Sequence, residues 1–331
     1  MIHGRLKWVD FAKGLVILFV IVGHTVHSSF RAVIFSFHMP FFFALSCITF
    51  RCSRNTTEFW KKTKKAFFHL IIPALIVFMV LTVLELYKSA SQISVAYLWR
   101  FAKDRLLMLL YASGMRYETM GMKIPAIGMV WFLFALFIGR SLFDYLHMKL
   151  SGSMLFIACW VLSVIGVYFG YREWLPFSLD IVLAIMPFFW LGHALQSVDV
   201  EKQKLIRGSI CALVWLVTFL PVYLISQTVM ELAVRDYTAY PLCYLTAAAG
   251  TLAVVYLSVA AVRWGKWTEM ICFLGRHSLY LLCIHSIDYL WAPLWKVQHR
   301  VGAPLLRTAL TIVALFIFLG IGKMLLQKEK P

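Results

Sequence analysis

Charged residues are scarce in this chain of 331 residues. Only 14% of the residues are charged and only 15 are acidic, whereas a typical soluble domain has about 25% charged residues. This shortage excludes an intrinsically disordered protein and fits poorly with a soluble enzyme. Apolar residues make up 62% of the chain. The composition therefore predicts an all-α integral membrane protein with several spans.

Paired cysteine spacings, internal repeats and polar linkers are also missing. The 7 cysteines show no CxxC pattern and mostly lie in apolar runs, so we predict structural thiols, no disulfides and no metal site. Without repeats or linkers, residues 1–331 are predicted to form a single transmembrane domain with no appended soluble domain. The short basic start before an apolar run, without a small-residue cleavage site, predicts an uncleaved signal anchor.

Ten apolar segments are long enough to cross about 30 Å of hydrocarbon. The predicted bundle of about ten helices has spans at 11–29, 33–50, 70–87, 128–146, 153–170, 179–197, 208–226, 241–262, 271–292 and 304–323. One long connection, about 88–127, is predicted to be an outer loop. Its amphipathic stretch Val95–Tyr111 is suited to the membrane interface, with Trp99 and Tyr111 against lipid and Arg105 facing headgroups.

Basic residues outnumber acidic ones by 32 to 15, which gives a formal net charge of +17. In a soluble protein this excess would suggest nucleic acid, but here we expect no nucleic-acid partner, because basic residues collect in cytoplasmic loops and at anionic lipid. The segments predicted inside carry 18 Lys and Arg, against 5 in the short outer loops. This asymmetry predicts that both termini are cytoplasmic.

An aspartate, a lysine and a histidine with helical spacing lie in the first predicted span or just before it. Lys13 and His24 are eleven residues apart, which places them on one helix face about 16 Å apart along the axis. Asp10 lies one turn before Lys13 and can pair with it. The pattern predicts a polar track from the cytoplasmic surface to beyond the middle of the membrane. Alternatively, Asp10 and Lys13 are only an anchor pair at the membrane interface, and His24 only donates a hydrogen bond to another helix.

Other polar positions have two interpretations each. His38 precedes Pro40, where freed backbone carbonyls predict a polar site, although an interfacial histidine in an aromatic belt has the same pattern. The lysine run that includes Lys61, Lys64 and Lys65 either enforces topology or binds the phosphates of a cytosolic donor.

Six segments, taken in order, resemble the acyltransferase-3 family of integral-membrane O-acyltransferases over about residues 5–325. They are WVDFAKGLVILFVIVGH at 8–24, FSFHMPFFFALS at 35–46, KKAFFHLIIPALI at 64–76, MVWFLFALF at 129–137, LPFSLDIVLAIMPFFWLGHAL at 175–195 and FLGRHSLYLLCIH at 273–285. The family motif of a basic residue, ten residues and a histidine matches Lys13 and His24, and the DxxKG form resembles the fucose 4-O-acetylase-like branch. Cys47 and His193 depart from the family, where Gly and an aromatic residue are common.

The resemblance implies an enzyme of the bacterial inner membrane. It would move an acyl group, with acetyl-CoA as the first choice of donor and no metal, to a hydroxyl of a cell-surface or lipid-linked carbohydrate. Its partners would be acyl-CoA, the glycan acceptor and membrane lipid. A transporter or permease for a small polar solute such as an amino acid is the alternative function, and a structural subunit of an export complex is a third. The acceptor, the acyl group and the oligomeric state stay open, with a homo-oligomer as one option.

The resemblance also implies roles for individual residues. His24 would be the general base or the first acceptor of the acyl group. Lys13 would contact the donor, with Asp10 holding it in place. The acceptor and the cavity would involve four further residues, His38, Trp131, Ser278 and His285. Phosphates of the donor would meet Lys61, Lys64 and Lys65.

Overall fold

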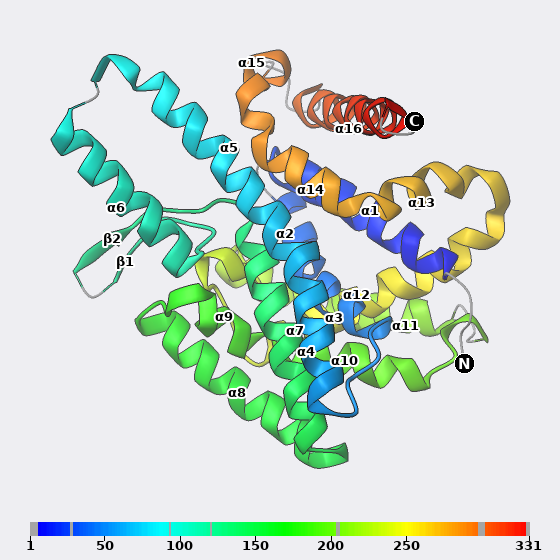
Figure 1. The fold of residues 1–331 in the computed structure, drawn as a ribbon. Coiled ribbons are helices and arrows are strands. Elements are labelled where there is room, and N and C mark those ends of the chain that lie inside the picture. Colours follow the sequence, from blue (N-terminus) through cyan, green and yellow to red (C-terminus); the bar gives the residue numbers. More distant parts are fainter. Residues whose placement is uncertain are drawn as a thin grey trace.

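The structure is a computed structural model that describes residues 6–26, 29–92, 94–119, 121–202, 206–296 and 302–328. Nearly all of it is helical (Figure 1). The first half contains α1 (Lys7–Gly23), α2 (Ser29–Phe35), α3 (His38–Ile48), α4 (Thr56–Ala66), α5 (Ile72–Lys88), α6 (Val95–Tyr111), β1 (Tyr117–Thr119), β2 (Met122–Ile124), α7 (Trp131–Lys149) and α8 (Gly152–Arg172). The second half contains α9 (Leu179–Ala184), α10 (Met186–Ala194), α11 (Ile206–Ser226), α12 (Leu242–Ala261), α13 (Glu269–Arg276), α14 (Ser278–Ile287), α15 (Ala292–Trp295) and α16 (Gly302–Lys328).

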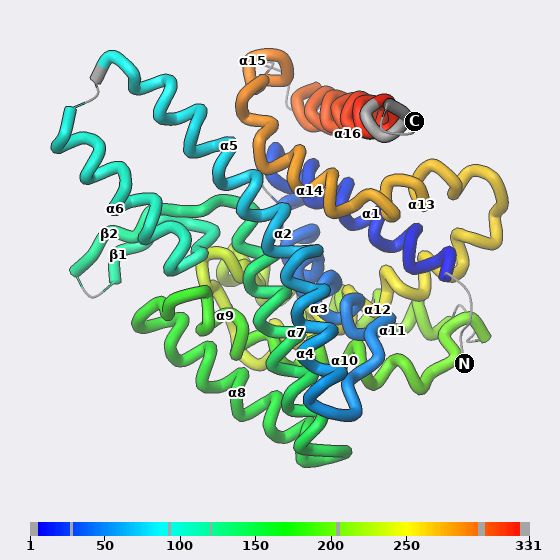
Figure 2. The backbone as a smooth tube through the Cα atoms, viewed as in Figure 1, coloured from blue at the N-terminus to red at the C-terminus, as the bar shows by residue number. Residues whose placement is uncertain are grey.

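Helix α1 lies among several other helices of the bundle and contacts α3, α12, α13, α14 and α16 (Figure 2). Its close crossing with α13 depends on two glycines. A Cβ on Gly14 would lie 1.9 Å from the backbone oxygen of Ile271, and one on Gly275 would lie 1.7 Å from that of Asp10. Small residues of this kind let membrane helices pack backbone to backbone. The crossing fixes the part of α1 that carries Asp10 and Lys13.

Helices on the outside of the bundle present apolar side chains. On α8, Ile157, Val161 and Val164 are each more than half exposed, and Val217 and Leu224 on α11 are 61% and 64% exposed. The exposed positions on α8 are three or four residues apart and those on α11 are seven apart, so each set lies on one helix face. In water such faces would be an aggregation hazard, whereas hydrocarbon solvates them. The prediction of an all-α membrane protein is therefore confirmed.

In the described residues, six helical segments are long and apolar enough to cross a membrane, or up to seven if a bent pair counts as one span. That pair, Pro176–Ala184 and Met186–Ser197, is bent by 51°. The ten spans and the cytoplasmic termini stay predictions. Helix α1 has only 17 residues, and the ninth predicted span is divided at His277 between α13 and α14. We call the end of the bundle at which α1 begins the inner end, and the end at which His24 lies the outer end.

The long connection between α5 and α7 contains α6 and a small hairpin, with Tyr117 paired to Ile124. Trp99 is 76% exposed, as the amphipathic pattern predicts. The prediction for Tyr111 is wrong, because Tyr111 is buried. At this point Ser178 Oγ donates to the carbonyl of the next residue, Ala112. The prediction for Arg105 is also wrong: it forms a 2.7 Å ion pair with Glu85 and is 13% exposed.

Candidate active site

A cavity of about 210 Å³ lies inside the bundle, bordered by residues of α1, α3, α7 and α14. Lys13 and His24 both line it, as their spacing on one face of α1 predicts. Most of the wall is apolar. Polar and aromatic side chains also line it, among them Lys13, His24, Ser46, His69, Trp131, Arg140 and Ser278. The cavity therefore collects several ionisable groups in an apolar bundle, as a reaction site requires.

Three basic side chains line one part of the cavity: Lys13, His69 and Arg140. His69 lies in a π-helical turn, Phe67–Ile71, that precedes Pro73 at the start of α5. Such turns add a residue to the helix and often occur at functional sites. The charges of Lys13 and Arg140 both act on His69. This basic group is suited to an anion, because charge-assisted hydrogen bonds to phosphate are strong.

His24 lies at the C-terminal end of α1, where its backbone N–H still donates to Val20. It is exposed although the preceding Gly23 is buried, so its ring is accessible. Its ring centroid lies 5.5 Å from that of Phe35 and 5.5 Å from that of His285. The position combines an accessible imidazole with neighbours that hold it, which a general base needs.

A chain of polar side chains lies behind His24. His285 Nδ1 lies 2.8 Å from Asp288 Oδ2. Arg307 donates to both carboxylate oxygens of Asp288 at 2.7 Å. It also donates to the His24 carbonyl at 3.2 Å and to Thr25 Oγ1 at 3.0 Å. Arg307 thus ties the end of α1 to Asp288.

The carboxylate of Asp288 also selects one form of the neighbouring imidazole. Because it is an acceptor, it favours the form of His285 in which Nδ1 carries hydrogen. The other ring nitrogen, Nε2, is buried and has no hydrogen-bond partner among the described residues. A carboxylate that orients a histidine in this way is a recurring element of active sites.

The predicted site residues occupy different places. Trp131 and Ser278 line the cavity with Lys13 and His24. His38 and His285 lie one layer behind its wall; both are buried, and the His38 ring lies 4.6 Å from Phe35. Asp10 is 6% exposed and also lies off the wall. The lysines on α4 are exposed and lie outside the cavity: Lys61, Lys64 and Lys65.

Sequence reasoning missed four polar residues of this region. His69 and Arg140 line the cavity, and Asp288 with Arg307 stands behind it. A usable signal existed for Asp288, since an acidic residue three positions after His285 in an apolar segment is expensive unless it is paired. Its pairing with Arg307 depends on the packing of α16 against α14, which no local pattern reveals.

Comparison with known proteins gives one family. The model of an acyltransferase domain matches residues 6–323, nearly the whole chain. No curated protein and no solved structure matches the chain significantly. The family match agrees with the apolar helix faces and with the ionisable groups in the cavity. The chain belongs to the acyltransferase-3 family of membrane acyltransferases.

Proposed function

We propose that the protein is a membrane O-acyltransferase, in the first instance an O-acetyltransferase. It would move an acyl group from cytosolic acyl-CoA to a hydroxyl of a cell-surface or lipid-linked carbohydrate, at the bacterial inner membrane. One observation carries the proposal: a single cavity is lined both by a basic group and by an accessible histidine, Lys13 and His24 lying eleven residues apart on one helix.

The size of the cavity suggests that only part of the donor molecule enters it. At about 210 Å³ it is smaller than the roughly 300–1,000 Å³ of pockets that hold a whole drug-sized ligand. It suits the acyl group and the slender pantetheine arm of coenzyme A. The pyrophosphate would meet Lys13, His69 and Arg140. The nucleotide would stay outside, where Lys61, Lys64 and Lys65 are exposed on α4.

His24 is the residue proposed to transfer the proton. In the proposed reaction its neutral imidazole takes the proton of the acceptor hydroxyl while the hydroxyl oxygen attacks the thioester carbonyl carbon. A C–O bond forms, the C–S bond breaks, and the same proton passes to the departing sulfur. The products are an O-acyl ester and free coenzyme A. Arg307 acts as a positioning residue, because it holds the backbone carbonyl of His24.

The acceptor would enter from the outer end. Trp131 is the first residue of α7 and lines the cavity, and an indole face suits the C–H face of a sugar ring. A Cβ on Gly114 would lie 2.5 Å from the Trp131 ring, so the segment after α6 touches this wall. The roles of His38, Ser278 and His285 near the acceptor, and the fucose 4-O-acetylase-like branch, are part of the same proposal.

The test is single-turnover consumption of radiolabelled acetyl-CoA by the purified full-length protein in detergent, with an extract of cell-envelope glycans. His24→Ala is compared with His277→Ala, a matched control whose ring bonds to the Phe273 carbonyl and lies off the cavity wall. We expect the wild type and the control to consume the thioester and His24→Ala to fail. If the wild type neither binds nor consumes it, the donor assignment is wrong, and solute uptake into vesicles would favour the transporter.

A further inference from the structure

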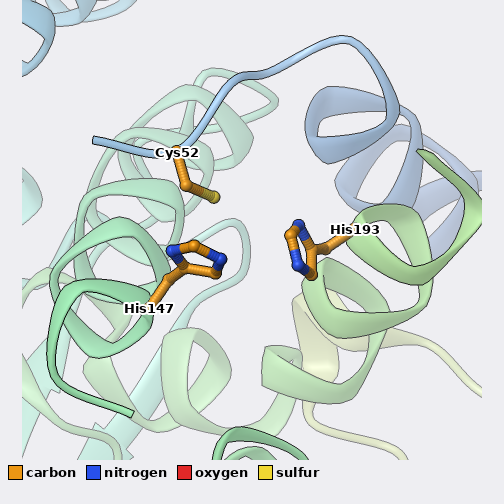
Figure 3. Close-up of side chains that lie close together, drawn as sticks. All are labelled: Cys52, His147 and His193. Atoms are coloured by element: carbon orange, nitrogen blue, oxygen red, sulfur yellow. The ribbon is translucent and has the colours of Figure 1, made fainter. Parts of the chain in front are cut away.

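Three side chains with metal-binding atoms meet at the inner end of the bundle, and none of them lines the cavity. Cys52 follows α3, His147 lies near the end of α7, and His193 lies near the end of α10 (Figure 3). One ligand atom of each lies within 4.8 Å of the other two. We propose that Cys52, His147 and His193 form a Zn²⁺ site.

One ring nitrogen of each histidine lacks another partner. The Nδ1 atoms of His147 and His193 are both buried without a hydrogen-bond partner among the described residues. The ring centroids lie 4.7 Å apart with an angle of 72°, and Figure 3 shows the Cys52 sulfur directed toward the space beside them. Buried polar atoms are normally satisfied. A metal ion would supply the missing partner.

The ligand atoms lie nearly as close together as zinc requires. With Zn–N bonds of about 2.0–2.1 Å and a Zn–S bond of about 2.3 Å, ligand atoms of a tetrahedral site lie roughly 3.3–3.6 Å apart. The upper limit of 4.8 Å leaves an adjustment of about 1 Å, which side-chain rotation can provide. One thiolate and two imidazoles suit zinc, and a water would take the fourth position.

The segment that carries Cys52 is anchored on both sides. The Ser53 backbone N–H donates to Asp144 Oδ1 at 2.6 Å and its hydroxyl donates to Oδ2 at 2.7 Å. In the 3₁₀ turn Leu195–Ser197 that follows α10, Gln196 Nε2 donates to the Phe50 carbonyl at 2.6 Å and also to the Cys47 carbonyl. The carriers of all three ligands are therefore held before any metal arrives, which lowers the entropic cost of binding.

The site would act as a clamp. It joins the ends of α7 and α10 to the segment that leads into the basic helix α4, and none of its three ligands lines the cavity. All 7 cysteines are free thiols. Zn²⁺ binding would form a Zn–S bond to Cys52, and the thiol proton would be released to solvent.

The test uses the full-length protein in detergent after removal of metal by a chelator. Zn²⁺ is titrated in competition with a chromogenic chelator, and bound metal is counted by mass spectrometry. Cys52→Ser and His193→Phe are compared with Cys211→Ser, a control that removes a partly buried thiol on α11. We expect one Zn²⁺ per chain in the wild type and control, and at least ten-fold weaker binding in both cluster variants. Equal affinity in all four proteins, or no uptake by the wild type, would overturn the proposal.

A second readout does not require the variants to fold. Co²⁺ added to the metal-free wild type should give a thiolate-to-cobalt charge-transfer band in the near ultraviolet, because Co²⁺ accepts the same tetrahedral ligands. Absence of that band in the wild type would contradict the assignment of Cys52. The inference is independent of the proposed acyl transfer, since neither readout measures activity.

Discussion

Two arginine–aspartate pairs are buried in this membrane domain, and they serve different purposes. Arg235 and Asp180 are 1% and 0% exposed, and Arg307 and Asp288 are 7% and 1% exposed. In each pair the shortest contact is 2.7 Å. Burial and distance therefore do not separate the two pairs, and the difference lies in what each pair contacts next.

The other contacts of the Arg235–Asp180 pair connect neighbouring segments of the chain. Arg235 also donates to Ser113 Oγ, to Ser178 Oγ and to the Ala233 carbonyl, and its guanidinium lies 3.6 Å above the Trp174 ring. These contacts join the segment after α6, the start of α9 and the connection between α11 and α12. The hydrogen bonds of this pair all hold segments together, so we interpret the pair as a staple.

The Arg307–Asp288 pair is continued by a titratable group. Asp288 also contacts His285, whose Nε2 has no hydrogen-bond partner in the described part of the chain and whose ring lies 5.5 Å from that of His24. His24 in turn lines the cavity. A buried ion pair is thus a weak indicator of function by itself, and the group at its end is what distinguishes the two pairs.

The largest expected effect comes from replacing His24, the titratable residue to which the Arg307–Asp288 pair leads. His24→Gln should lower kcat by about 10²–10⁴-fold, which is the usual contribution of a general base, while thermal unfolding changes little because His24 is accessible. Single-turnover kinetics with acetyl-CoA measure this loss. Full activity in His24→Gln would show that another group accepts the proton.

The next largest effect is expected when the aspartate of each pair is replaced by asparagine. Asp288→Asn should lower kcat per folded molecule by about 10²-fold, because an amide no longer selects the His285 form that a carboxylate favours. Asp180→Asn is the matched variant and should leave kcat unchanged while it lowers the temperature of unfolding. Kinetics and scanning calorimetry on the same preparations separate the two outcomes, and identical behaviour of both variants would remove the distinction drawn here.

The staple itself gives the third prediction. Arg235→Met should destabilise the domain by about 3–5 kcal/mol, since it leaves the Asp180 carboxylate buried without its partner. Adding Asp180→Leu should recover most of the loss, because an apolar pair of similar volume is often neutral. Thermal unfolding of the three proteins in one detergent measures this. A double variant no more stable than Arg235→Met would argue against an isolated staple.

Local periodicity accounts for what the sequence could predict. The positions of Lys13 and His24 follow from one helix, and helical geometry places them on one side without further information. The helical stretch at Val95–Tyr111 was likewise predictable from its pattern. The burial of Tyr111 was not, because it depends on packing at a point where Ser178, from a distant segment, donates to the Ala112 carbonyl.

Residues that meet only through packing were beyond such reasoning. The contact of Asp288 with Arg307 requires α16 to lie against α14, and the meeting of Cys52, His147 and His193 requires three segments at one end of the bundle. His193 was visible in the sequence as a departure from the family pattern, but its partners were not.

The basic part of the cavity gives the fourth prediction. Lys13→Ala should raise KM for acetyl-CoA about ten-fold, equivalent to about 1.4 kcal/mol, and change kcat less, because the residue is proposed to bind the donor rather than to transfer the proton. Lys13→Arg should retain most of the affinity, since the charge persists and guanidinium also binds phosphate. Steady-state kinetics at several donor concentrations distinguish the two parameters. A fall in kcat with KM unchanged would place Lys13 in the chemical step instead.

The smallest effect is expected on the exposed face of α4. Lys61→Gln with Lys64→Gln should raise KM for acetyl-CoA only about two- to four-fold, because both side chains are solvated and exposed charges interact weakly. The matched control is Arg100→Gln with Lys103→Gln on α6, which removes the same charge from exposed positions at the other end of the domain. The Debye length falls to about 3 Å at 1 M salt. The two double variants should therefore have the same KM for acetyl-CoA at that salt concentration. An effect that is equal in both pairs would reflect net charge alone, whereas one that persists at high salt would mean direct contact between these lysines and the bound nucleotide.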